Sequence, residues 1–322
     1  MRVLSHRNPE TGARSFAVML GERAITAEEL RDAGGFDHTD ALLDTYWLLE
    51  SEGWHDRLKE AHAKALRNGA VGRLASTFTP AAAIQTPEKI VCVGLNYRDH
   101  VAEGGREAPT RPLIFAKFAN AVVADGEAIV HPAGTHALDF EAELGVVIGK
   151  RAKHVSAANA IDHVAGYVVC NDISARDWQG VKAALHEGEV GDGQWLRAKS
   201  SDTFLPMSAV LVTTEEVPYP DQLPIRGWLT PGSGPDAGTP VLMQEASTSE
   251  MIWTIPELIE YITAVMTLEP GDIISTGTPA GVGVFRDPPV YLQPGDRVRV
   301  EVGGIGGTDN PVISEDAAAA RR

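Results

Sequence analysis

The chain has 322 residues, 43% of them hydrophobic, which is enough for a sizeable core and corresponds to about two domains by length. Its 44 acidic and 28 basic residues leave a formal net charge of -16, which repels nucleic-acid phosphates and anionic lipid. We therefore expect neither nucleic acid nor a membrane surface as a partner. An anionic substrate would need locally placed Lys or Arg, or a bound cation.

Residues 1–86 are predicted to form a small N-terminal α/β domain. Two apolar runs, RVLSH and RSFAVML, indicate a hairpin, and Thr26 with Glu29 has the spacing of a capping box. Residues 40–68 carry apolar side chains at helical intervals with an interruption near Gly53. This pattern predicts one or two amphipathic helices.

The second predicted domain covers residues 87–313 and is rich in strands. Pro80 and Pro87 indicate a linker before it, because proline cannot donate to a strand ladder and restricts its neighbour. Seven β-branched runs separated by turn residues predict strands: KIVCVGL, AIVHP, LGVVIG, AGYVVC, SAVLVTT, DIIST and RVRVEVG. A capping box at Thr254 predicts a helix. Residues 314–322 have little to pack and are expected to form a flexible tail.

The two cysteines, Cys92 and Cys170, lie inside apolar runs, which predicts buried free thiols in a reducing compartment. The first residues contain no apolar segment of signal-peptide length, and no run of about 18 apolar residues occurs. We therefore expect a soluble, cytoplasmic protein.

In LDFEAELGVVI, strand alternation places Asp139, Glu141 and Glu143 on one face and apolar residues on the other. The alternative interpretation is an ordinary solvent face. Three acids without an intervening Lys or Arg repel one another, however, and a hard divalent cation would offset this repulsion. We therefore favour a metal site on this motif.

Asp172 follows the apolar run VAGYVVC and therefore lies at the end of a predicted buried strand. An Asx turn or a helix cap is an equally good explanation of this aspartate. As a third ligand with Glu141 and Glu143, it would complete an all-oxygen set. Such a set suits Mg²⁺ or Mn²⁺ rather than zinc.

Seven segments in this order give residues 88–312 a resemblance to a known family: GLNYRDHVAEGG, PLIFAKF, DFEAELGVVIGK, VAGYVVCNDISARDWQ, QWLRAKSSDTFLP, LEPGDIISTGTPAGVG and PGDRVRVEVGGIG. The chain resembles the fumarylacetoacetate hydrolase family, in its bacterial acylpyruvate hydrolase and oxaloacetate decarboxylase-like branch. The resemblance implies an α+β fold with a mixed β-roll or sandwich core. It also implies a homodimer that uses Mg²⁺ or Mn²⁺ and acts on a small 2-oxo acid.

The resemblance also assigns roles to individual residues, which we take as expectations. The expected metal ligands are Glu141, Glu143 and Asp172, the expected catalytic residues are His100, Glu103 and Lys199, and the expected substrate-binding residues are Arg176, Gln179 and Thr278.

For some of these residues, the chemistry and spacing of the side chains support the expected role independently of the resemblance. His100 and Glu103 would share a face of a helical turn, so the carboxylate can orient the imidazole, although two exposed helix residues are the alternative. Arg176 and Lys199 are either surface cations or the local positive charge that an anionic substrate needs. The TGTPAGVG segment around Thr278 lacks the Lys of a nucleotide-binding loop.

The predicted reaction is hydrolysis of a C–C bond in a 2,4-diketo acid such as an acylpyruvate or fumarylpyruvate, giving pyruvate and a carboxylic acid. Oxaloacetate decarboxylation and isomerisation or decarboxylation of a 2-hydroxydienoate are the alternatives, because all share a metal-stabilised enolate. An alternative of another class is a non-catalytic metal-binding or ligand-binding homologue.

Two segments depart from the family pattern. Residues 180–193 are longer than the usual link and contain His186, Glu187 and Glu189, and a surface loop is favoured over a lid. Residues 229–253 replace a short hairpin and leave the length of the substrate open.

Overall fold

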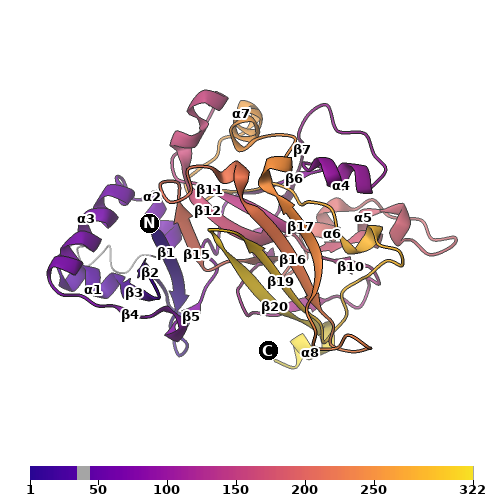
Figure 1. The fold of residues 1–322 in the computed structure, drawn as a ribbon, viewed down its shortest axis with the longest axis horizontal. Coiled ribbons are helices and arrows are strands. Elements are labelled where there is room, and N and C mark those ends of the chain that lie inside the picture. Colours follow the sequence, from indigo (N-terminus) through magenta and orange to yellow (C-terminus); the bar gives the residue numbers. More distant parts are fainter. Residues whose placement is uncertain (35–43, 322) are drawn as a thin grey trace.

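The computed structural model describes residues 1–34 and 44–321, which form a mixed α+β fold around two main sheets (Figure 1). The large sheet has 13 strands, ten of which lie in the order β4-β3-β2-β1-β15-β12-β11-β18-β6-β7. The second sheet has the order β17-β16-β19-β20-β9, and β10 pairs with β13. The α+β class expected from the sequence is confirmed.

The strands of the large sheet are β1 (Arg2–Arg7), β2 (Arg14–Leu20), β3 (Arg23–Thr26), β4 (Arg73–Leu74), β5 (Thr79–Pro80), β6 (Ile90–Gly94), β7 (Leu113–Lys117), β8 (Val122–Ala124), β11 (Ala142–Ile148), β12 (Val164–Asn171), β14 (Leu205–Met207), β15 (Val210–Thr213) and β18 (Ile273–Ser275). The other strands are β9 (Ile129–His131), β10 (Leu138–Asp139), β13 (Ser174–Ala175), β16 (Pro224–Thr230), β17 (Val241–Ser247), β19 (Arg297–Val302) and β20 (Gly306–Ser314). The α-helices are α1 (Ala27–Asp32), α2 (Thr45–Glu50), α3 (Trp54–Arg67), α4 (Arg98–Glu103), α5 (Arg176–Gln179), α6 (Trp195–Lys199), α7 (Ile255–Val265) and α8 (Glu315–Ala319).

The N-terminal hairpin predicted from the two apolar runs is confirmed, because β1 and β2 pair antiparallel. The capping box predicted at Thr26 is also present and starts α1. The predicted helical stretch is divided between α2 and α3, and Gly53 lies at the break with a φ of 64°, a left-handed conformation that favours glycine. The expected start of this stretch, at residues 40–43, lies outside the described residues.

The N-terminal strands continue directly into the large sheet. β1 pairs antiparallel with β15, so that Arg2 lies opposite Val212. The segment expected to be a linker is also integrated, because β5 pairs with β1 and the Ile84 side chain is fully buried. Pro80 is tolerated there because β5 is a two-residue strand off the main path of the sheet.

The centre of the large sheet is fully buried. Each of the seven predicted β-branched runs overlaps a strand, namely β6, β9, β11, β12, β15, β18 and β19. β11 lies between β12 and β18, and each of its residues is buried. Cys92 and Cys170 are buried free thiols on β6 and β12, as predicted. Figure 1 shows α4, α5 and α6 at the end of the molecule away from α1 and α3.

The segment that departs from the family pattern and the predicted tail both contain regular secondary structure. The departure at residues 229–253 is mostly the β16–β17 hairpin, whose strands pair antiparallel. Residues 315–319, expected to be a flexible tail, form the one-turn helix α8, which Ser314 caps and whose side chains are not buried. No helix in the described residues is long and apolar enough to cross a membrane.

Candidate active site

Three carboxylates converge where β11 and β12 lie side by side. Glu141, Glu143 and Asp172 each offer an oxygen, and these oxygens all lie within 4.8 Å of one another. Glu143 is on β11, Glu141 directly precedes it, and Asp172 directly follows β12. Their exposures of 5%, 1% and 0% rule out a solvent face as the reason for the acidic alternation.

Asp139 does not join this cluster, although strand alternation placed it on the same face as Glu141. The predicted continuous strand is interrupted, because β10 ends at Asp139 and β11 starts at Ala142. Asp139 instead accepts hydrogen bonds from the N–H groups of Gly283 and Val284 at 2.9 and 3.1 Å. It also pairs with Arg176, whose Nε lies 2.9 Å from Asp139 Oδ2.

Buried cations partly neutralise the cluster. The Lys199 ammonium donates to Glu141 Oε2 at 2.6 Å and to Asp172 Oδ2 at 2.8 Å, and Arg176 reaches Glu141 Oε1 at 2.8 Å. Lys117 lies 2.7 Å from the other oxygen of Asp172. Within the described residues, no cation contacts Glu143, whose Oε2 accepts from the Ser275 hydroxyl and the Gly277 N–H.

The pKa values of the two glutamates shift in opposite directions because of this unequal neutralisation. Burial raises the pKa of Glu141, but Arg176 and Lys199 outweigh it and hold that pKa below its usual range. Burial, followed by Asp172 and Glu141, raises the pKa of Glu143 well above its usual value. Glu143 is therefore the carboxylate of the cluster that has no ion pair with a cation among the described residues.

A divalent cation fits this arrangement. The donor set is made only of carboxylate oxygens, which are the ligands that Mg²⁺ and Mn²⁺ prefer. Additional positive charge would matter most at Glu143, which no cation contacts among the described residues. Glu141, Glu143 and Asp172 are therefore the residues that would hold the ion.

The His100–Glu103 pair lies on α4, and the helical spacing predicted from the sequence is present. His100 Nδ1 and Glu103 Oε2 are 3.3 Å apart, and the Gly281 N–H donates to the other Glu103 oxygen at 2.9 Å. His100 is only 6% exposed, so the pair is not two free surface residues. Its ring lies 5.9 Å from that of Phe285.

One cleft brings most of the predicted site residues together. Its lining includes His100, Glu141, Glu143, Arg176, Gln179, Lys199 and Thr278, together with the unpredicted Arg106, Phe115, Trp195 and Phe285. Glu103 and Asp172 stand behind this lining and contact His100 and Lys199 respectively. Each residue assigned from the family resemblance is thus in or directly behind one cleft.

Two of the expected substrate contacts are already engaged within the protein. Gln179 Oε1 accepts from Arg176 at 3.2 Å. The Thr278 hydroxyl donates to the Ala142 carbonyl at 3.0 Å and accepts from Gln244 Nε2 at 2.8 Å. Gln244 is fully buried on β17 and was not predicted, because it belongs to the divergent 229–253 segment.

Lys117 was also missed, although a signal existed: it is a lone cation at the end of the apolar run PLIFA. Its ammonium donates to the carbonyls of Ile173, Lys199 and Phe204 and is fully buried. Burial lowers the pKa of Lys117, and the carboxylate of Asp172 opposes that shift.

We expect Lys117→Met to destabilise the fold by about 3–5 kcal/mol, because it leaves Asp172 and three carbonyls without their buried donor. Urea unfolding of the metal-free protein measures this change. Lys153→Met is the matched control, since Lys153 is exposed, and its expected effect is about 0.5 kcal/mol or less. Equal stability of the two variants would contradict a supporting role for Lys117.

The carboxylate cluster and the histidine–glutamate pair in one cleft form a candidate active site, and the comparison with known proteins shows the family of the chain. The family model described as "Fumarylacetoacetate (FAA) hydrolase C-terminal" matches residues 89–313. The chain belongs to the fumarylacetoacetate hydrolase family, as its motifs indicated.

Individual relatives have several activities. Over 238 residues the chain is 44% identical to the mitochondrial oxaloacetate tautomerase FAHD2B of Bos taurus, covering 74% of this chain and 70% of that protein. A 5-carboxymethyl-2-hydroxymuconate delta-isomerase from Mycobacterium smegmatis has a TM-score of 0.68 at 30% identity, covering 98% and 99% of the two chains. Maleylpyruvate hydrolase from Sphingobium sp. SYK-6, solved with manganese(II) and pyruvate, has a TM-score of 0.72 at 26% identity, covering 98% and 99%. These relatives are enzymes, and this chain is an enzyme of the same family.

Proposed function

We propose that the protein moves a proton at the carbon next to the ketone of a small 2-oxo dicarboxylic acid, with keto–enol tautomerisation of oxaloacetate as its reaction. The observation that carries the proposal is the convergence of Glu141, Glu143 and Asp172 beside Lys199 and His100 in one cleft. The 44% identity to an oxaloacetate tautomerase supports this choice of reaction.

Mg²⁺ or Mn²⁺ held by Glu141, Glu143 and Asp172 would supply Lewis-acid polarisation of the substrate ketone. Glu103 holds Nδ1 of His100, so Nε2 is the nitrogen that accepts the proton from the substrate carbon and returns it. Lys199 remains protonated, because Asp172 and Glu141 outweigh burial and raise its pKa. Its ammonium then stabilises the negative charge that develops on the substrate oxygen.

Arg106 favours a substrate with a second carboxylate. Its exposed side chain lines the cleft, and no ion-pair partner faces it within residues 1–34 and 44–321. Arg176, in contrast, is already engaged by Asp139 and Glu141. Arg106 is therefore the cation at the cleft that has charge available for the distal end of a dicarboxylate.

Hydrolysis of a 2,4-diketo acid is the second candidate. The same His100–Glu103 pair can take a proton from water instead of carbon, and a maleylpyruvate hydrolase has a similar fold. The hydroxide would add to the distal carbonyl, and the C–C bond would break to release pyruvate enolate and an acid. Decarboxylation of oxaloacetate would use the same enolate.

Enol-rich oxaloacetate distinguishes these reactions. With the metal-depleted enzyme resupplied with Mg²⁺ or Mn²⁺, we expect accelerated loss of the enol ultraviolet band without formation of pyruvate. Simultaneous release of pyruvate and CO₂ would change the assignment to a decarboxylase. Turnover of acylpyruvates to pyruvate and an acid, without an effect on oxaloacetate, would establish the hydrolase. If no substrate turned over with either metal, the proposed function would be wrong.

We expect Arg106→Met to raise KM for oxaloacetate about three- to tenfold with little change in kcat, since an exposed cation contributes roughly 1 kcal/mol. Initial rates at varied substrate concentration give both constants. Arg111→Met, at an exposed cation in the same segment that does not line the cleft, is the control. A large fall in kcat, or an equal effect of both substitutions, would contradict the carboxylate-binding role.

A further inference from the structure

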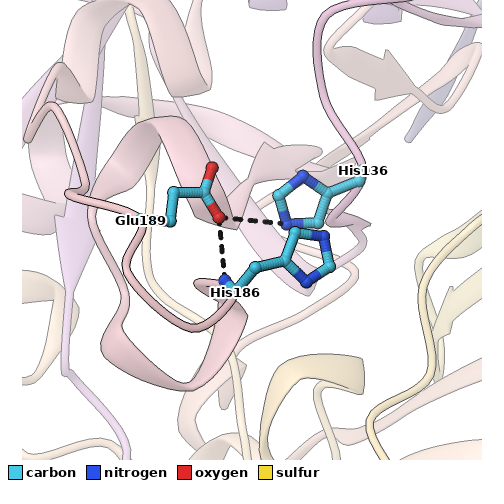
Figure 2. A group of neighbouring side chains, drawn as sticks. All are labelled: His136, His186 and Glu189. Atoms are coloured by element: carbon cyan, nitrogen blue, oxygen red, sulfur yellow. Dashed lines mark hydrogen bonds and ion pairs between the residues drawn. The ribbon is translucent and has the colours of Figure 1, made fainter.

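A second cluster of metal-ligating side chains lies outside the active-site cleft. His136, between β9 and β10, meets His186 and Glu189 from the divergent 180–193 segment, and their ligand atoms all lie within 4.8 Å of one another. Figure 2 shows the Glu189 carboxylate directed at His136 and at the backbone of His186, with the two imidazole rings face to face. The ring centroids are 4.0 Å apart and the ring planes are inclined by 21°.

Neighbouring side chains hold the His136 ring in position. The Asp177 carboxylate is buried and lies 3.3 Å from His136 Nδ1, an arrangement in which a carboxylate fixes the tautomer and direction of a ligating histidine. Thr135 holds the other Asp177 oxygen. On the opposite side of the ring, Nε2 lies 3.7 Å from Glu189 Oε2, a spacing compatible with two ligands of one ion.

Glu189 is positioned as well, because its Oε2 accepts the backbone N–H of His186 at 2.8 Å. The imidazole of His186 is exposed, and neither of its ring nitrogens has a hydrogen-bond partner in the described part of the chain. His136 Nε2 lies 2.9 Å from the carbonyl oxygen of Ala184. An ion bound at Nε2 would displace this contact with the carbonyl, since the same nitrogen faces both.

We propose that His136, His186 and Glu189 form a second metal site, which takes a transition-metal ion such as Zn²⁺. Two imidazoles and one carboxylate are a donor set that zinc binds, whereas the buried all-carboxylate cluster suits Mg²⁺ or Mn²⁺. The two donor sets therefore favour different metal ions. The exposure of His186 and Glu189 gives the ion access from solvent.

The position of the site gives it a structural role. An ion would join His186 and Glu189 to His136 and so close the 180–193 segment onto the chain before β10. Asp177, which orients His136, follows Arg176 on α5, and Val181 lines the active-site cleft. A bound ion would thus stabilise the segment next to Val181 at the cleft, although His136, His186 and Glu189 do not line the cleft themselves.

Zinc binding by the full chain tests the proposal. The carboxylate cluster is first occupied with excess Mg²⁺, and Zn²⁺ is then titrated against a fluorescent chelator. We expect one additional Zn²⁺ per chain in the wild type. His186→Gln and, separately, His136→Gln should weaken that binding by at least about tenfold. Glu187→Gln is the matched control, because Glu187 is an exposed acid of the same segment outside the cluster, and it should bind like the wild type.

Tryptic cleavage after Lys182 gives a second readout, since this residue is exposed near the start of the segment. Zn²⁺ should slow cleavage in the wild type and in Glu187→Gln, but not in His186→Gln. The proposal would be overturned by the absence of additional Zn²⁺ in the wild type, or by equal zinc affinity of the wild type and both histidine variants. Because the readouts are binding and proteolysis, they do not depend on the proposed reaction.

Discussion

Glu143→Gln is expected to lower kcat/KM by about 10³-fold and to abolish stabilisation of the fold by Mn²⁺. The substitution removes one of three converging carboxylates, and loss of metal polarisation costs several kcal/mol of transition-state stabilisation. The melting temperature of the metal-free protein should not fall, because the neutral amide retains an oxygen for Ser275 and Gly277 and no longer repels its acidic neighbours. This combination separates loss of metal binding from misfolding.

Steady-state rates and melting curves with and without Mn²⁺ provide both readouts, since an ion that binds only the folded chain raises its apparent stability. Glu107→Gln is the control, because Glu107 is exposed on the segment that follows α4 and lies outside the cluster. A Glu143→Gln variant that kept its full Mn²⁺-induced shift would show that the ion binds elsewhere.

Lys199→Met is expected to reduce kcat by about 10²–10³-fold while tightening the binding of Mn²⁺. The ammonium now shares Glu141 and Asp172 with any bound cation, so its removal leaves both carboxylates freer to bind the ion. The same change removes the donor proposed to stabilise the developing oxyanion, an interaction of this magnitude in other enzymes.

Titration with Mn²⁺ and measurement of kcat at saturating metal test both parts. Lys59→Met is the control, since Lys59 is half-exposed, pairs with Glu215 on the surface and should leave both quantities unchanged. If Lys199→Met lost Mn²⁺ affinity, Lys199 would support the cluster by packing and not compete with the ion. If kcat were unchanged, its catalytic role would be wrong.

Short sequence patterns predicted the position of a site residue correctly where the local strand structure alone determines that position. Alternation correctly placed Glu141 and Glu143 together, because Glu143 is on β11 and Glu141 is the residue directly before that strand. The end of an apolar run placed Asp172 beside them. Alternation failed at Asp139, since the interruption of the strand at residues 140–141 contains neither glycine nor proline to reveal it. The partner that redirects Asp139 is Arg176, 37 residues later.

The rest of the site depends on contacts between distant segments. Gln244 reaches Ala142 and Thr278 from a hairpin whose sequence departs from the family. His136 and His186 are separated by 50 positions and have no fixed spacing, so the cluster of Figure 2 has no motif. Lys117 was visible only as one cation after an apolar run, a pattern that also occurs at ordinary strand ends. The role of such residues depends on contacts that only the tertiary fold creates.

The pairing of β1 with β15 has a consequence for the order in which the chain folds during synthesis. About 200 residues must be translated between these strands, which at roughly 5–20 residues per second takes about 10–40 s. β5 can cover the end of β1 at His6 and Arg7 early in that interval. The part of β1 that pairs with β15, residues 2–4, keeps an open edge until β15 is made, and its backbone N–H and C=O groups have only water or another chain to bind. The first segment made is thus among the last to be completed.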